Sequence, residues 1–187
     1  MNKNRIEAFS DGVLAIIITI MVLGLKTPIG NDLASLQTLL PSLTTYLLSF
    51  IYVGIYWNNH HHLLQATLVI NGKVLWANLH FLFWLSLLPF ATGYMGESHF
   101  EKLPTAFYGF ILLMASVAWQ ILIHYLREIQ SADSLLHLAY GNRIKVFSSM
   151  TLYSLGTAIS FIFPILAVCI YILVAILWII PERKLEN

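Results

Sequence analysis

The chain has 187 residues, of which 58% are hydrophobic and only 10% are charged, and its formal net charge is +1. Ordinary soluble domains are roughly 45 to 50% apolar and about 25% charged, so this composition predicts an integral membrane protein. The near-neutral balance gives no support to a nucleic-acid or acidic partner, and the single cysteine, Cys169, excludes an internal disulfide and a multi-cysteine metal site.

Six stretches are apolar enough to cross a bilayer, whose hydrocarbon core needs roughly 20 residues per helix. We expect transmembrane helices over residues 6–26, 38–62, 73–95, 103–127, 144–162 and 163–181. The last two stretches adjoin, and we divide them at Pro164 because a proline disrupts the interior of a helix. One long kinked helix there, with five spans in total, is the alternative. The fold class is therefore all-α, with residues 1–187 forming a single transmembrane domain.

Basic residues flank these stretches unevenly. If the N-terminus is cytoplasmic, only Lys26 and Lys102 of the 10 basic residues lie outside. The cytoplasmic set is Lys3, Arg5, Lys73, Arg127, Arg143, Lys145, Arg183 and Lys184. Both termini then lie in the cytoplasm and the number of spans is even, which favours six over five. We expect a multi-pass protein of the cell membrane.

The first span becomes almost wholly apolar after Gly12. At about 100° per residue, Ile16, Ile20 and Leu23 share one stripe, with Thr19 beside it. This stripe is a candidate functional surface.

Asp11 lies about 140° away from Ile16 around the same helix, so it faces different surroundings. A carboxylate is costly against lipid, and it should turn toward other helices and find hydrogen-bond donors there. Arg5 and Ser10 are close enough in sequence to join the same polar cluster. We interpret the cluster as a buried anchor for the helix that carries the stripe.

Partners for this anchor are available in the second and third spans. The segment YWNNHHH places Trp57 and His61 one turn apart, and WANLHF supplies Asn78 and His80. An indole N–H, an imidazole and an amide can satisfy an aspartate and a serine. The one-turn spacing from Trp57 favours His61 over His60 as the partner.

The three adjacent histidines also allow a different function. A proton-coupled or metal-ion transporter would use Asp11 with His60, His61 and His62, because ionisable residues inside a membrane are often functional. Adjacent helical positions splay by about 100°, however, so the three cannot chelate one ion from a regular helix, and we expect no metal site. No GxSxG, HExxH or P-loop motif is present, and we expect no enzymatic activity.

The start of the first span carries a recognisable motif. RIEAFSD, followed by GVLAIIIT, resembles the RxxxFSD signature of the transmembrane protein 175 family of potassium channels, in its short prokaryotic form. YWNNHH, ANLHFLFWLSLLPF and FYGF also resemble family positions, so the resemblance covers most of the chain. The last two spans match only in hydrophobic character.

This resemblance implies a homotetramer of six-helix subunits in which four copies of the first helix line a central pore. Ile16, Ile20 and Leu23 take the hydrophobic constricting positions, and Thr19 takes the position of a threonine linked to selectivity. The family positions that brace the pore helix are Arg5, Phe9, Ser10 and Asp11, with Trp57, His61 and Asn78 as their expected partners.

The expected function is that of a potassium-preferring cation channel gated by rings of hydrophobic side chains, without a TVGYG filter. Potassium ions are its permeant species, and no other cofactor is expected. The expected partners are further copies of the chain and membrane lipid, with no nucleic acid and no soluble small-molecule substrate. Selectivity for potassium over sodium should be modest compared with that of a carbonyl filter.

Overall fold

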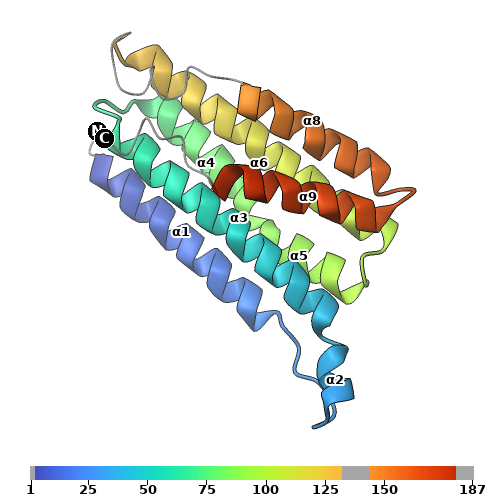
Figure 1. Cartoon of the computed structure of the whole chain (residues 1–187). Helices are drawn as coiled ribbons and strands as arrows, with labels where there is room; N and C mark the ends of the chain where they lie inside the picture. The colour runs from blue at the N-terminus through green and yellow to red at the C-terminus, as the bar shows by residue number, and fades with distance from the viewer. Residues whose placement is uncertain (1–2, 132–143, 180–187) are drawn as a thin grey trace.

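The computed structural model describes residues 3–131 and 144–179. Within these ranges the regular structure is entirely helical (Figure 1). The helices are α1 (Lys3–Leu23), α2 (Leu33–Gln37), α3 (Leu40–Gln65), α4 (Gly72–Ser86), α5 (Leu88–Glu97), α6 (Lys102–Ile129), α8 (Ile144–Ile159) and α9 (Pro164–Ile179).

Each predicted span overlaps a helix or a pair of helices in the structure. α9 begins at Pro164, where the sequence predicts a break. The range 73–95 divides into α4 and α5, which meet at Leu87, because Pro89 lacks the N–H that would bond to the carbonyl of Leu85. The last two residues of the predicted span 163–181 lie outside the described residues, as do Arg143, Arg183 and Lys184.

Three stretches of the described chain are able to cross a membrane by length and composition alone. They are Lys3–Leu23, Gly72–Glu97 and Lys102–Ile129. α3, with 26 residues, is also long enough to cross a membrane, but it carries the polar YWNNHHH segment near its end. α9 is shorter and strongly apolar.

α6 lies at the centre of the subunit. It packs against α4 and α5 on one side and against α8 and α9 on the other. α1 lies at an edge and packs against α3, α4 and α5 (Figure 1). Because α1 is peripheral, one of its faces is open to the outside of the subunit.

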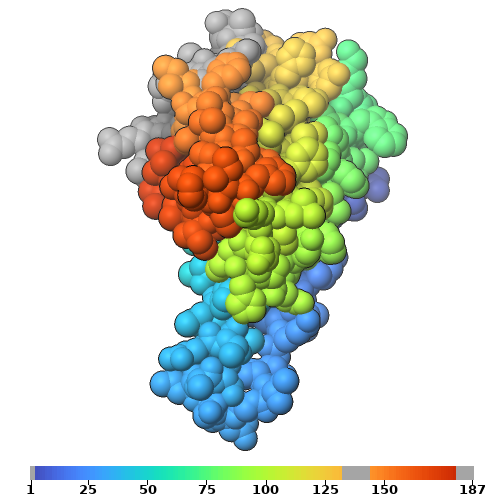
Figure 2. Space-filling view, turned by 90° about the vertical axis from the view of Figure 1, so that its right-hand side faces the viewer, coloured from blue at the N-terminus to red at the C-terminus, as the bar shows by residue number. Residues whose placement is uncertain are grey.

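The connection from α1 to α3 projects beyond the rest of the subunit (Figure 2, blue). Asp32 caps the short α2 by accepting a hydrogen bond from the Ser35 backbone N–H at 2.9 Å. Hydrogen bonds from Ser35, first from its hydroxyl and then from its backbone, lower the pKa of the Asp32 carboxyl. Nearby, Lys26 Nζ lies 2.7 Å from Glu97 Oε2, which ties the end of α1 to the end of α5.

Tyr171 of α9 is fully buried between two glycines on neighbouring helices. A methyl group added at Gly109 of α6 would collide with the Tyr171 hydroxyl, and one at Gly156 of α8 would meet the Tyr171 ring at 2.6 Å. The Tyr171 hydroxyl donates to the carbonyl of Thr105 at 3.3 Å. The two glycines therefore set how closely α6, α8 and α9 approach one another.

Substitution Gly109→Ala should force Tyr171 out of its place and lower the free energy of unfolding by about 1 to 3 kcal/mol, as is usual for overpacking. The measurement is the thermal unfolding midpoint of the purified protein. Gly54→Ala in α3 is the control, because an added methyl group there meets nothing within 4 Å. A Gly109→Ala protein as stable as the Gly54→Ala protein would contradict this packing.

Candidate functional site

The predicted stripe on α1 faces away from the core of its own subunit. Ile16 is 59% exposed and Leu23 is 78% exposed, and Ile20 and Thr19 are also exposed. The opposite face of the helix is buried, with Ile6, Ser10, Leu14, Ile17 and Met21 against α3, α4 and α5. The structure thus brings the four stripe residues together on one open face.

This open face also carries small residues. Ala8, Gly12 and Ala15 are exposed along it, and a methyl group at Gly12 would meet nothing within 4 Å. The Thr19 hydroxyl donates to the Ala15 carbonyl at 2.9 Å, so its hydrogen is satisfied and its oxygen can still accept a hydrogen bond. The open face of α1 therefore carries smaller and more polar side chains than a face made only of large aliphatic residues.

The exposed face of α9 has a different composition. Its exposed side chains are mostly large and aliphatic: Ile165, Leu166, Ile172, Leu173, Ile176 and Leu177. A surface of this kind suits lipid tails, which offer no hydrogen bonds. The exposed face of α1, with its small residues and the Thr19 hydroxyl, therefore differs from that of a helix that faces only lipid.

A directed chain of hydrogen bonds holds the start of α1 against α4 and α3. Ser10 is fully buried and donates to the Ile6 carbonyl at 2.8 Å, so its oxygen must accept from Asn78 Nδ2 at 3.0 Å. Asn78 Oδ1 is then the acceptor for His60 Nε2 at 2.8 Å. This order fixes a proton on Nε2 of His60.

A second set of bonds lies closer to the surface of the subunit. Trp57 Nε1 donates to Asp11 Oδ1 at 3.0 Å. His61 Nδ1 lies 3.0 Å from Glu7 Oε1, and Gln65 Nε2 lies 2.8 Å from His61 Nε2. Because the Gln65 amide donates to Nε2, the proton of His61 is on Nδ1 and points at the Glu7 carboxylate. α3 therefore forms hydrogen bonds to two acidic residues of α1, Glu7 and Asp11, that lie one turn apart.

Two histidines take part in these contacts, His60 as well as the predicted His61. Asn78 contacts His60, because His60 faces the interior of the subunit, whereas His61 lies toward the start of α1 and reaches Glu7. Glu7 did not figure among the predicted site residues, although its position one turn before Asp11 was a usable signal. His80 accepts a hydrogen bond from Trp84 Nε1 at 2.9 Å and stays within its own helix.

Arg5 and Phe9 lie apart from both sets of bonds. Arg5 is exposed and has no hydrogen bond or ion pair to the part of the chain that the structure describes, and Phe9 is 53% exposed. Both lie on the open side of α1, so their bracing role remains a prediction that concerns surroundings outside the single subunit.

The three adjacent histidines point in different directions. His60 is buried, His61 bonds to Glu7, and the ring of His62 meets that of His61 edge-on at 5.8 Å. Across residues 3–131 and 144–179, no group of three or more His, Cys, Asp or Glu side chains is placed to hold a metal ion. His60 and His61 each bond through one ring nitrogen to a neighbouring helix.

Comparisons with known proteins point to one family. The model of the family described as endosomal/lysosomal potassium channel TMEM175 matches residues 5–89, which include most of α1 and all of α3 and α4. A potassium channel from Chryseobacterium sp. (strain P1-3) is 53% identical over 187 residues, which cover 100% of this chain and 97% of the relative. The chain belongs to the TMEM175 family. It is accordingly a multi-pass membrane protein and a cation channel.

A solved structure of the same family has the same fold. The crystal structure of a lysosomal potassium-selective channel TMEM175 homolog from Chamaesiphon minutus is 27% identical, with a TM-score of 0.76 over 95% of this chain and 96% of that chain. The zebrafish (Danio rerio) endosomal/lysosomal proton channel TMEM175 is 37% identical over 83 residues, 36% of this chain and 16% of the relative. Because TMEM175 proteins are ion channels, the prediction that this chain is not an enzyme is confirmed.

The bond between Asp11 and Trp57 can be tested directly. Asp11→Ala leaves the Trp57 N–H without its acceptor, and we expect a loss of about 1 to 2 kcal/mol in stability and a lower yield of assembled protein. Asp11→Asn keeps an acceptor oxygen and should lose less. Thermal unfolding and size-exclusion chromatography are the measurements.

A double variant completes this test. Trp57→Phe added to Asp11→Ala should cost little more than Asp11→Ala alone, because both changes remove one and the same hydrogen bond. Wild-type yield and stability in Asp11→Ala would show that Asp11 does not hold α1 in place.

Proposed function

We propose that this chain is a potassium-preferring channel whose central pore is lined by four copies of α1 in a homotetramer. The observation that carries the proposal is the open face of α1, with Ile16, Thr19, Ile20 and Leu23, on a helix that is otherwise anchored to its subunit. The Chryseobacterium relative, which is named as a potassium channel, supports potassium as the permeant ion.

A pore on this face requires further copies of the chain. The open side of α1 lies at the edge of the subunit, and a row of hydrophobic side chains on one helix encloses no path for an ion. Closed cyclic symmetry would place identical faces around one axis, so each copy supplies a quarter of the wall. Arg5 and Phe9, on the same open side, would then lie close to the neighbouring subunit.

The gate follows from the chemistry of the face. A ring of four Ile16 side chains excludes water when narrow and admits hydrated or partly hydrated ions when it widens slightly, and rings of Ile20 and Leu23 lie farther along. We assign the principal constriction to Ile16. A hydrophobic ring discriminates poorly between cations, so ion preference must come from other groups.

Two features of α1 favour cations. The Thr19 hydroxyl oxygens keep a free lone pair because their hydrogens bond to Ala15, and four of them would surround the axis. The C-terminal end of α1, near Leu23, carries the negative end of the helix dipole. Both are weak compared with a carbonyl filter, so we expect modest selectivity for potassium over sodium.

We further propose six membrane spans with both termini in the cytoplasm of a cell-membrane protein. Lys73 at the start of α4 lies 3.7 Å from Glu128 near the end of α6, which places these charges at one end of the bundle. Lys3 lies at that end too, donating to the carbonyl of Gln65 at 3.4 Å. This end is the more basic one, as the positive-inside rule requires of the cytoplasmic side.

The substitution Ile16→Asn should hydrate the constriction and raise the open-channel current, with an altered potassium to sodium preference. The measurement is the reversal potential and unitary current of the purified protein in a planar bilayer under a potassium against sodium gradient. Ile176→Asn on α9 is the matched control, because Ile176 is 53% exposed but lies on the aliphatic face. Unchanged currents in Ile16→Asn would place the pore elsewhere.

The substitution Thr19→Val keeps the shape of the side chain and removes its oxygen. We expect the reversal potential to move toward zero under the same gradient, because the ring of acceptor oxygens is lost, while current persists. Thr44→Val in α3 controls for loss of an exposed threonine that bonds to its own helix. A reversal potential identical to wild type would remove Thr19 from the selectivity mechanism.

The transporter hypothesis gives a different result in the same material. A proton-coupled or metal-ion transporter that uses Asp11 and His60 to His62 predicts no unitary current, and ion uptake into liposomes only when a proton gradient is applied. That result would replace the channel by coupled transport.

A further inference from the structure

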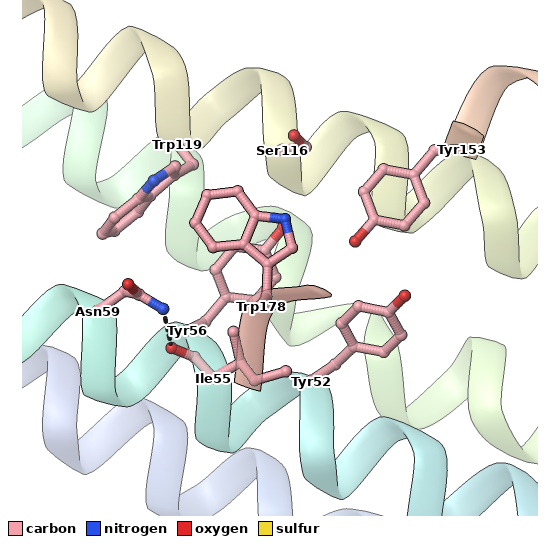
Figure 3. A pocket seen from close by; sticks show the side chains of 8 residues that line it. All are labelled: Tyr52, Ile55, Tyr56, Asn59, Ser116, Trp119, Tyr153 and Trp178. Carbon is pink, nitrogen blue, oxygen red and sulfur yellow. Dashed lines mark hydrogen bonds between the residues drawn. The ribbon is translucent and has the colours of Figure 1, made fainter. Parts of the chain in front are cut away.

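We infer that each subunit binds an ordered water molecule in a cavity between α3, α6, α8 and α9, on the side of α3 away from the proposed pore helix. The cavity has a volume of about 20 Å³. A buried water needs roughly 10 to 15 Å³, so the cavity has room for one. Its walls are drawn in Figure 3: Tyr52, Ile55, Tyr56, Asn59, Ser116, Trp119, Tyr153 and Trp178.

Aromatic rings form most of the wall and hold one another in place. The ring of Tyr56 meets that of Trp119 edge-on at 6.2 Å, and the rings of Tyr52 and Tyr153 lie 6.2 Å apart. Trp178 crosses in front of them (Figure 3). Its Nε1 donates to the Ser149 hydroxyl at 2.7 Å. The packed rings leave a defined space and do not collapse into it.

Two residues of this wall are buried, and their hydroxyl groups have no hydrogen-bond partner in the described part of the chain. Tyr56 on α3 is 9% exposed and Ser116 on α6 is 6% exposed. Neither hydroxyl makes a hydrogen bond to any residue that the structure describes, whereas Tyr52, beside them, donates to the carbonyl of Tyr171. Buried polar groups in proteins are nearly always hydrogen-bonded, and a water is the usual partner when protein supplies none.

The positions of these hydroxyls suit one shared water. Tyr56 and Ser116 come from different helices and line the same cavity, and Figure 3 shows the hydroxyl ends of Tyr52 and Tyr153 facing each other beside them. A water there has two to three polar partners, the number that such waters usually have. It would bridge α3 to α6 at the level where α3 holds α1 through Trp57.

The sign of a stability change tests this inference. If water binds, Tyr56→Phe and Ser116→Ala each remove one of its partners, and the unfolding midpoint of the full-length protein should fall by roughly 2 to 4 °C. The double variant should fall by less than the sum, because both hydroxyls hold the same water. If the cavity is dry, removing an unpartnered hydroxyl leaves the midpoint unchanged or raises it, which overturns the inference.

A direct probe separates hydration from packing. Hydroxyl radicals generated by X-rays from water inside the protein should label Tyr56 faster than Tyr108, a buried tyrosine whose hydroxyl lies 2.9 Å from the Ser49 hydroxyl, away from the cavity. Ser116→Val fills the cavity and should reduce labelling of Tyr56 to the level of Tyr108. Equal labelling of the two tyrosines in wild type would overturn the inference.

A control variant guards against nonspecific effects. Ser154→Ala on the exposed side of α8 removes a hydroxyl that donates to the Met150 carbonyl at 2.9 Å, and it should leave both readouts unchanged. None of these changes touches α1, so potassium flux into liposomes should persist in every variant. Water in this cavity can therefore be tested independently of the location of the pore.

Discussion

The buried hydroxyl of Ser10 fixes the rotation of α1 about its axis. It takes part in one chain with Asn78 and His60, whose donors and acceptors allow only one order. A turn of α1 by one residue, about 100°, would break this chain inside a medium with no water to replace it. The same turn would move Ile16 from the open face toward the core. The direction of the proposed pore surface thus depends on a hydrogen bond two turns away from it.

Restraint is uneven along α1, and this has consequences for motion. The first three turns are held by polar contacts to α3 and α4, and the far end is held by the exposed pair Lys26 and Glu97. Exposed ion pairs contribute little to stability. Between the two ends the contacts are apolar and tolerate small displacements better than directed hydrogen bonds do. A gate at Ile16 would lie where the contacts of α1 change from directed hydrogen bonds to apolar packing.

The sequence predicted the helices and the stripe well because both depend on properties of one helix. Hydrophobic length predicted helices where the structure has them, and the 3.6-residue period placed Ile16, Ile20 and Leu23 on one side of α1. Partners across helices depend on the rotation of α3 relative to α1 and α4, which a single-helix argument does not contain. For this reason the spacing from Trp57 favoured His61, which contacts Glu7 of α1, but did not reveal the additional bond between His60 and Asn78. The number of subunits came only from family resemblance.

The anchor and the aromatic cavity follow from the same constraint on opposite sides of α3. A helix at membrane depth can carry a hydroxyl, an amide or an imidazole only if another group completes its hydrogen bonds. Toward α1, Asn78 of α4 bonds to Nε2 of His60 and donates in turn to Ser10 of α1. Toward α6, Tyr56 and Ser116 line a space too small for a side chain and large enough for water. α3 therefore carries polar side chains on two faces, although its 26 residues are enough to cross a membrane.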